Sequence, residues 1–256
     1  MAFILSKDAA IYYEEYGSGE TLILLPGLLG TVESHWRRFI PEFARHFHVI
    51  AVDLRGHGKT NNPSGKLGIG AFVEDLHTLF DSLQIEQASL CGYSLGGYIG
   101  LAYGLRNPGK VHALIMHGTK FFWTEVAVEA AVKDFDPAVI MQKVPTWGEA
   151  LQRDHEPGNG IDGWKRLLKT SGEFIESMQH NGLSHENLSR AVFPVTVSVG
   201  DSDEMIPREE AERLVSLLPN ASLHIMENTK HPMQSMQKAP FVEIALSFFG
   251  AAARPT

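Results

Sequence analysis

The sequence predicts an α/β fold: a mostly parallel, eight-stranded sheet flanked by helices, with a helical segment inserted into it. Short apolar runs recur along the chain, and longer segments with a helical repeat separate them. Continuous apolar runs of this length are typical of strands covered on both faces, as in parallel sheets. The alternation of such strands with helices is the pattern of an α/β domain.

Composition excludes several classes of protein. A chain of 256 residues allows one large domain or two small ones. The net charge of −8 argues against nucleic acid as the main partner, because phosphate binding needs clustered positive charge. A single cysteine excludes a disulfide-stapled secreted domain. With no signal-peptide pattern and no apolar run of membrane-spanning length, we expect a cytoplasmic protein, monomeric or homodimeric, with no membrane partner.

Apolar runs predict the strands. Buried strands are expected at 22–25, 49–52, 88–91, 113–116 and 195–199, with a weaker case at 223–226. At the N-terminus, residues 11–16 and the Gly-Ser-Gly turn at 17–19 predict an antiparallel edge hairpin.

Segments with helical periodicity lie between these strands. Apolar residues from Ile69 to Leu83 recur at i, i+3, i+4 and i+7, which makes one apolar stripe. A second helix is expected from Leu95 to Arg106. A third is expected to open at Pro207, because proline suits the first helical position and three acids follow in the first turns.

Residues 120–190 break this rhythm, since no convincing strand occurs there. Helical pieces are expected at 124–133, 147–155 and 163–178, with separators at Pro137, at Pro145 and at 157–160. A stretch this long is not a simple loop in a compact domain. We therefore predict a helical cap at 120–190, inserted between the two parts of a sheet domain at 1–119 and 191–256.

The segment 92–97, Gly-Tyr-Ser-Leu-Gly-Gly, carries the candidate nucleophile. A serine on a sharp strand-to-helix turn has its hydroxyl held clear of the sheet, and glycines are needed where side chains would collide with backbone. The bare pattern is weak, but the preceding strand and following helix strengthen the case for Ser94. The N–H of Leu95 can then bind a developing oxyanion. Gly100 and Gly104 are expected only to let the helix pack closely.

A serine hydroxyl needs a base to take its proton. Among the twelve histidines, we favour His231, which follows the strand at 223–226 in a polar loop. Catalytic groups in α/β sheets gather at the carboxyl ends of strands. His57 is the alternative, because it lies in the loop that follows the strand at 49–52.

The acid that orients the histidine is also expected after a strand. Segment 200–207 offers three carboxylates, and we favour Asp203 because its position beyond the strand end gives it reach. Asp201 is the alternative, with a turn or cap contact as its structural role. The order Ser94, Asp203, His231 is the order of hydrolases with a nucleophile elbow.

With these residues in place, the chain resembles the α/β-hydrolase fold family, in its group of small esterases, lactonases and C–C hydrolases. The resemblance rests on the elbow and on three further segments, 25–30, 53–60 and 200–207. It implies that segment 25–30 is the oxyanion loop, with Leu28 as the backbone donor, and that the family's acid falls on Asp203. It places His57 in a structural loop.

Two departures from the family pattern matter, and the first still leaves the N–H of Leu28 able to donate. The oxyanion loop usually begins His-Gly, whereas this chain has Pro26-Gly27. The elbow sequence Gly-Tyr-Ser-Leu-Gly-Gly also resembles that of the family's menaquinone-pathway lyase. The arginine that usually follows it there is replaced by Tyr98, which counts against lyase activity. A serine at the elbow, instead of an aspartate, disfavours the epoxide hydrolase and dehalogenase branches.

We therefore expect a serine hydrolase that forms an acyl-enzyme from small esters or lactones, with no cofactor and no metal. Phe122, Trp123 and Tyr93 are expected to bind the substrate, while Trp147 and Trp164 are expected rather to pack the cap. The alternatives are the same triad used for C–C hydrolysis, a lyase step or cofactor-free oxidation, or a ligand-binding member without turnover. Cys91 is expected to be buried and not to be the nucleophile.

Overall fold

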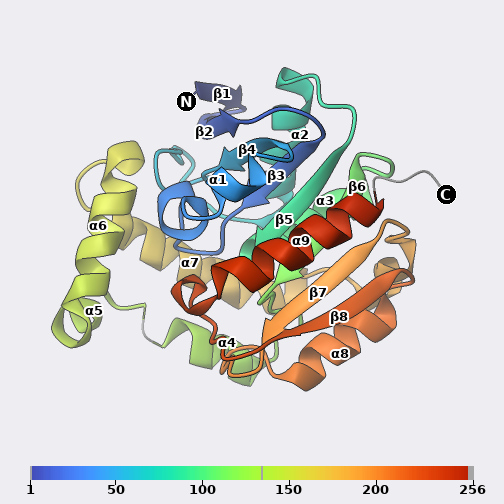
Figure 1. Ribbon diagram of the computed structural model, residues 1–256. Helices are drawn as coiled ribbons and strands as arrows, with labels where there is room; N and C mark the ends of the chain where they lie inside the picture. Colours follow the sequence, from blue (N-terminus) through green and yellow to red (C-terminus); the bar gives the residue numbers. More distant parts are fainter. Residues whose placement is uncertain (1, 134, 253–256) are drawn as a thin grey trace.

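The computed structural model describes residues 2–133 and 135–252 as an eight-stranded sheet with helices on both faces (Figure 1), which confirms the predicted fold class. The strand order is β1-β2-β4-β3-β5-β6-β7-β8. The strands are β1 (Ala2–Ser6), β2 (Ala9–Tyr16), β3 (Thr21–Leu25), β4 (His48–Val52), β5 (Ala88–Tyr93), β6 (Val111–His117), β7 (Val195–Gly200) and β8 (Ala221–Met226).

The N-terminal edge differs from the expected hairpin. β2 pairs antiparallel with β1 and with β4, and every pairing from β4 to β8 is parallel. The hairpin turn is therefore at Lys7–Asp8. Gly17 and Gly19 instead begin the connection to β3, and a side chain at Gly17 would lie 2.3 Å from the carbonyl oxygen of Ala44.

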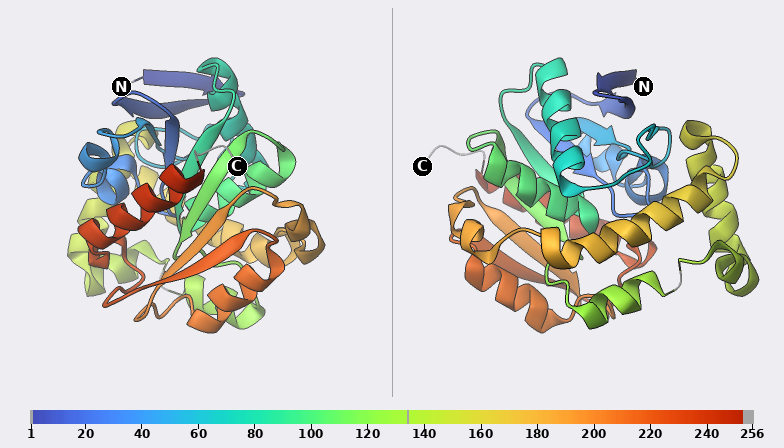
Figure 2. Two further views of the ribbon diagram at one scale, coloured as in Figure 1. Left: turned by 45° about the vertical axis from the view of Figure 1, so that its right-hand side comes forward. Right: turned by 180° about the vertical axis from the view of Figure 1, so that it is seen from behind.

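Helices cover the sheet in two layers, each with its own apolar core (Figure 2). One layer contains α1 (Ile40–Phe43), the π-helix η1 (Val32–Trp36) and α9 (Lys238–Ala252). The other contains α2 (Ile69–Ser82), α3 (Leu95–Arg106) and α8 (Arg208–Leu217). None of the helices within the described ranges has the length and apolar character needed to cross a membrane.

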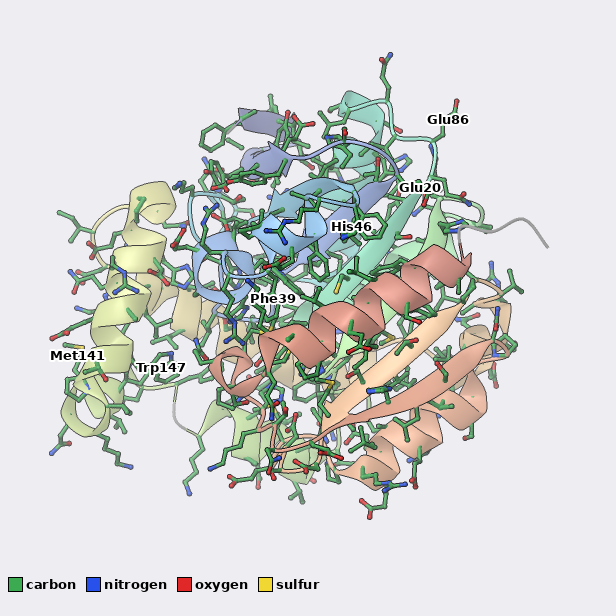
Figure 3. The ribbon with its side chains drawn as sticks, in the orientation of Figure 1. Glu20, Phe39, His46, Glu86, Met141 and Trp147 are labelled. Carbon is green, nitrogen blue, oxygen red and sulfur yellow. The ribbon has the colours of Figure 1, made fainter. Side chains whose placement is uncertain are left out.

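Residues 120–190, called the insertion below, lie between β6 and β7, and their described part is mainly helical. They form α4 (Glu125–Val132), α5 (Pro137–Lys143), α6 (Pro145–Asn159), α7 (Gly163–Asn181) and the 3-10 helix η2 (His185–Arg190). The α5–α6 pair stands to one side of the sheet (Figure 1), and Figure 3 shows Met141 and Trp147 on it.

Pro137 and Pro145 lie between helices, as predicted, and each is the first residue of the helix that follows. Asp136 caps the start of α5 by accepting the N–H groups of Ala138 and Val139. Pro157 was expected in a separator but lies inside α6. It falls in the last turn of α6, where it has no N–H to donate to the preceding turn, and the helix ends two residues later at Asn159.

α6 is seated on the loop that follows β4. The Asn159 side-chain amide donates to the carbonyls of Gly56 and Thr60 at 3.2 Å each. A side chain at Gly158 would lie 2.5 Å from the carbonyl carbon of Lys59, so this glycine permits close backbone contact. The insertion therefore contacts the sheet domain at the loop that follows β4.

Candidate active site

Ser94 lies at the turn between β5 and α3 with φ 51° and ψ −116°. A non-glycine residue at this positive φ is strained, as expected for a nucleophile elbow. A side chain at Gly92 would lie 2.2 Å from the backbone nitrogen of Gly97, and one at Gly96 would lie 2.2 Å from the carbonyl oxygen of Leu25. Both positions therefore require glycine.

The two later glycines of α3 have the packing role that was expected. A side chain at Gly100 would lie 2.7 Å from a methyl of Leu114, and one at Gly104 would lie 2.4 Å from the ring of Phe193. The helix thus lies close to β6 and to the segment before β7.

Asp203 and His231 are joined by a hydrogen bond of 2.9 Å from Nδ1 of the imidazole to Oδ2 of the carboxylate. Oδ1 of Asp203 accepts the N–H groups of Met205 and Ile206, both at 2.9 Å. Burial alone would raise the pKa of Asp203, but the bond to His231 and the two N–H donors hold that pKa below its ordinary value. The carboxylate is therefore ionised and fixed in direction.

Asp201 has the structural role that was its alternative. Its exposed carboxylate accepts the N–H of Asn228 at 3.0 Å and the N–H of Thr229 at 3.2 Å. These bonds lower the pKa of Asp201 and tie the end of β7 to the loop after β8.

Tyr93 precedes the elbow and holds the loop of His231. Its hydroxyl donates to the backbone carbonyl of His231 at 2.7 Å, and the two rings lie 5.6 Å apart. Burial raises the pKa of Tyr93, so the hydroxyl remains a donor. Tyr93 lines the cavity described below and also positions the histidine.

Segment 25–30, predicted to be the oxyanion loop, has a tight, strained turn. The N–H of Gly30 donates to the carbonyl of Gly27 at 3.1 Å, and Leu29 has φ 61°. Within the described part of the chain, the N–H groups of Leu28 and Leu95 have no protein acceptor. Leu28 and Leu95 line the same cavity as Ser94, as an oxyanion site requires.

Two histidines that the sequence pattern did not indicate hold this loop. Nδ1 of His35 accepts the N–H of Gly27 at 3.1 Å, and its ring packs edge-on against Tyr93. His155, from α6 of the insertion, accepts the N–H of Gly58 on Nδ1 at 2.8 Å. Because Nδ1 is an acceptor, Nε2 of His155 carries the proton and donates to the carbonyl of Leu29 at 3.1 Å.

His57 and Cys91 lie away from the chemistry. His57 is fully buried, bonds through Nδ1 to the carbonyl of Arg55 and does not line the cavity. Cys91 is fully buried in β5, and burial raises the pKa of its thiol. Among the residues that the structure describes, no group of three His, Cys, Asp or Glu could hold a metal ion.

The buried histidines predict a loss of stability in acid. Burial lowers the pKa of His35 and His57 to about 3, and of His117 and His155 to about 4. An unfolded histidine titrates near pH 6.5, so below that pH the unfolded chain binds protons that the native chain does not. Each histidine then removes about 1.4 kcal/mol of stability per pH unit, as the pH falls toward the native values.

Among the carboxyl groups of residues 2–133 and 135–252, Asp53 alone opposes this trend, because burial raises its pKa to about 6. We therefore expect urea denaturation to give a lower free energy of unfolding at pH 5 than at pH 7. An unchanged or higher value at pH 5 would contradict the neutral, buried state of these side chains.

A cavity of about 520 Å³ lies over the elbow, between the sheet domain and the insertion. Its lining is mainly apolar and comprises Leu28, Leu29, His35, Tyr93, Ser94, Leu95, Tyr98, Lys120, Trp123, Ala131, Phe135, Trp147, Phe174, Ile175, Met178, Met205, His231, Pro232, Met233 and Gln234. Ser94 and His231 thus face one space, roofed by residues of α4, α6 and α7.

The aromatic residues of the insertion divide between this cavity and packing. Trp123 lines the cavity, and so does Trp147, which was expected rather to pack the cap. Phe122 is not among the lining residues. Its ring packs against His185 and under the Arg213 guanidinium, 4.0 Å from the ring centre. Trp164 is buried within the insertion.

Comparison with known proteins decides the family. A family model described as alpha/beta hydrolase fold matches residues 20–179, more than half of the chain. The chain belongs to the α/β hydrolase fold family. The match includes the elbow at Ser94, whereas Asp203 and His231 lie beyond it and are brought together by the fold.

Within this α/β hydrolase family, the chain is similar to enzymes of several activities. It is 27% identical to the 2-hydroxy-6-oxo-2,4-heptadienoate hydrolase of Pseudomonas putida, over 97% of this chain and 95% of that protein. It is 26% identical to 3-oxoadipate enol-lactonase 2 of Acinetobacter baylyi, over 88% and 87% of the two chains. The meta-cleavage product hydrolase of Pseudomonas fluorescens IP01 has the same fold, with a TM-score of 0.84, 21% identity and 98% coverage of both chains.

Proposed function

We propose that the protein is a serine hydrolase that cleaves small carboxylic esters or lactones through a triad of Ser94, His231 and Asp203. The observation that carries this proposal is the 2.9 Å bond from His231 to a buried Asp203, with both Ser94 and His231 facing one apolar cavity. A fixed carboxylate, an imidazole and a strained serine are the parts of an acyl-transfer site.

The reaction begins with attack of Ser94 Oγ on the substrate carbonyl, while Nε2 of His231 accepts the hydroxyl proton. Asp203 keeps the Nδ1–H tautomer and stabilises the imidazolium that forms. His231 then gives the proton to the leaving alcohol, which leaves an acyl group on Ser94. A water molecule, deprotonated by the same imidazole, releases the acid and restores the serine.

Charge that develops on the carbonyl oxygen is stabilised by the N–H groups of Leu28 and Leu95. Their lack of other protein acceptors in the described chain supports this role. The elbow fixes the N–H of Leu95, and His35 and His155 hold the loop that carries Leu28. Loss of one such donor typically lowers the rate by about 10²–10³-fold.

The insertion at 120–190 is proposed to act as a cap on the sheet domain formed by 1–119 and 191–256. Trp123 and Trp147 are its candidate contacts for the substrate, because both line the cavity. The proposed partner is a small-molecule acyl substrate, since a cavity of about 520 Å³ fits a compact ligand.

Labelling with a fluorophosphonate probe tests the nucleophile. We expect the wild type to be labelled and to hydrolyse p-nitrophenyl acetate or butyrate. Ser94→Ala is expected to lose both labelling and at least about 10³-fold of kcat, because the remaining groups only bind and polarise the ester. A wild type that is not labelled would overturn the assignment of Ser94.

C–C bond hydrolysis is the second candidate, favoured by the similarity to the Pseudomonas putida hydrolase over nearly the whole of both chains. The same three residues would serve that reaction. Fluorophosphonate labelling of Ser94 without ester turnover, together with cleavage of a vinylogous diketone, would favour this candidate over the esterase.

A further inference from the structure

The cavity wall contains a largely buried ion pair that the hydrolytic mechanism does not use. Lys120, just after β6, pairs through Nζ with Glu210 of α8, and the two side chains are 13% and 11% exposed. Figures 1 and 2 show the first helix of the insertion, α4, at the same end of the molecule as α8. Lys120 lines the cavity, whereas Glu210 lies behind it.

Glu210 binds three donors at once. Its Oε2 accepts from Lys120, and its Oε1 accepts the backbone N–H groups of Phe121 at 3.0 Å and Phe122 at 3.2 Å. The carboxylate is therefore fixed on the start of the insertion, and the ammonium is drawn toward it. Arg213, on the same helix, lies over the Phe122 ring and does not reach the cavity lining.

This arrangement decides the charge of the cavity. Among the described residues that line it, Lys120 is the one Lys or Arg, and there is no Asp or Glu. With Lys120 paired to Glu210, the wall carries no net charge. A substrate carboxylate would lose its hydration in an apolar space and could be compensated only by drawing Lys120 away from a buried partner, which is costly.

We propose that Glu210 is a specificity-determining residue: by neutralising Lys120 it restricts the site to substrates whose acyl group is uncharged. This inference rests on the proposed ester hydrolysis. Glu210 acts without touching the substrate, because it sets whether the one cation of the wall is available to an anion.

The test compares ethyl esters of alkanoic acids with monoethyl esters of dicarboxylic acids of equal carbon number, from six to eight carbons, by ethanol release at pH 7. We expect the wild type to favour the uncharged ester in kcat/KM by about tenfold or more at each length, since a factor of ten corresponds to about 1.4 kcal/mol. Equal kcat/KM for the two series would overturn the proposal.

Glu210→Gln is the sharpest variant. The amide oxygen can still accept the N–H groups of Phe121 and Phe122, but the negative charge that neutralises Lys120 is removed. We expect the ratio of anionic to uncharged kcat/KM to rise at least about tenfold for one or more lengths, as expected for a new charge-assisted contact. The double variant Lys120→Met/Glu210→Gln is expected to lose this gain.

Glu209→Gln is the matched control, because it removes the same charge from an exposed neighbour on α8 and is expected to leave the ratio unchanged. A folded Glu210→Gln protein whose ratio equals that of the wild type would refute the role of Glu210. So would an equal gain in Glu209→Gln or in the double variant.

Binding separates this inference from the proposed reaction. In Ser94→Ala, calorimetric titration is expected to give tighter binding of hexanamide than of the monoamide of adipic acid, and Glu210→Gln is expected to narrow the difference. If the wild type hydrolyses no ester but this difference holds, the proposed reaction fails and the charge selection stands. If esters are hydrolysed and binding shows no difference, the charge selection fails alone.

Discussion

Asp203→Asn is expected to lower kcat for ester hydrolysis by about 10³–10⁴-fold while the fold persists. The amide would be able to donate to Nδ1 of His231, which favours the tautomer that carries its proton on Nε2. That imidazole cannot accept the proton of Ser94, and an imidazolium next to a neutral amide loses its stabilisation. Initial rates with p-nitrophenyl butyrate, alongside circular dichroism of the variant, provide the measurement.

Asp201→Asn is the matched control, two residues away in the same loop. The asparagine oxygen can replace only one of the two carboxylate oxygens, which accept the N–H groups of Asn228 and Thr229 separately. The other bond is lost from an exposed side chain that does not contact His231, so we expect a change in kcat of no more than a few-fold. Equal losses in the two variants would undo the assignment of Asp203 as the orienting acid.

Gly92→Ala is expected to destabilise the protein by about 3 kcal/mol or more, and much of the chain would be insoluble or inactive. The new methyl would lie 2.2 Å from the nitrogen of Gly97, with the carbonyl carbon and oxygen of Gly96 at 2.3 and 2.5 Å. These are backbone atoms at the start of α3, so no rotamer change relieves the overlap. Urea denaturation followed by circular dichroism measures the loss.

Gly70→Ala serves as the control for this substitution. Gly70 is exposed in α2, and a methyl there would meet only the end of the Arg106 side chain at 3.8 Å. Alanine is a better helix former than glycine, so we expect a stability equal to the wild type or higher by about 0.5–1 kcal/mol. A Gly92→Ala protein as stable as Gly70→Ala would show that the elbow tolerates a side chain.

The candidate catalytic residues that the structure brings to one edge of the sheet share one property, which is that each follows a strand. Ser94, Asp203 and His231 come directly after β5, β7 and β8 or within the loops that follow them. Parallel strands end at the same edge of the sheet, so chain order alone brings these loops together. Reach beyond the strand end also separated Asp203 from Asp201, and their hydrogen bonds agree with that choice.

The supporting residues could not be predicted in this way. His35 lies in a π-helix and His155 in the insertion, and neither position has a periodic or spacing signal that points to the oxyanion loop. Their roles depend on how separate segments pack in three dimensions. The same holds for Phe122, which is adjacent to Trp123 in the chain but packs under Arg213, outside the cavity lining.

The bond from His155 to Leu29 has a consequence for exchanging parts between related enzymes. Insertions between β6 and β7 are natural units to transplant when a new substrate range is wanted, because they roof the cavity. In this protein, replacing the insertion would also remove the His155 imidazole, which bridges Gly58 to Leu29. A donor insertion without a histidine at the equivalent position would leave the buried N–H of Gly58 and the carbonyl of Leu29 unpaired. A transplanted insertion must therefore include a histidine at that position.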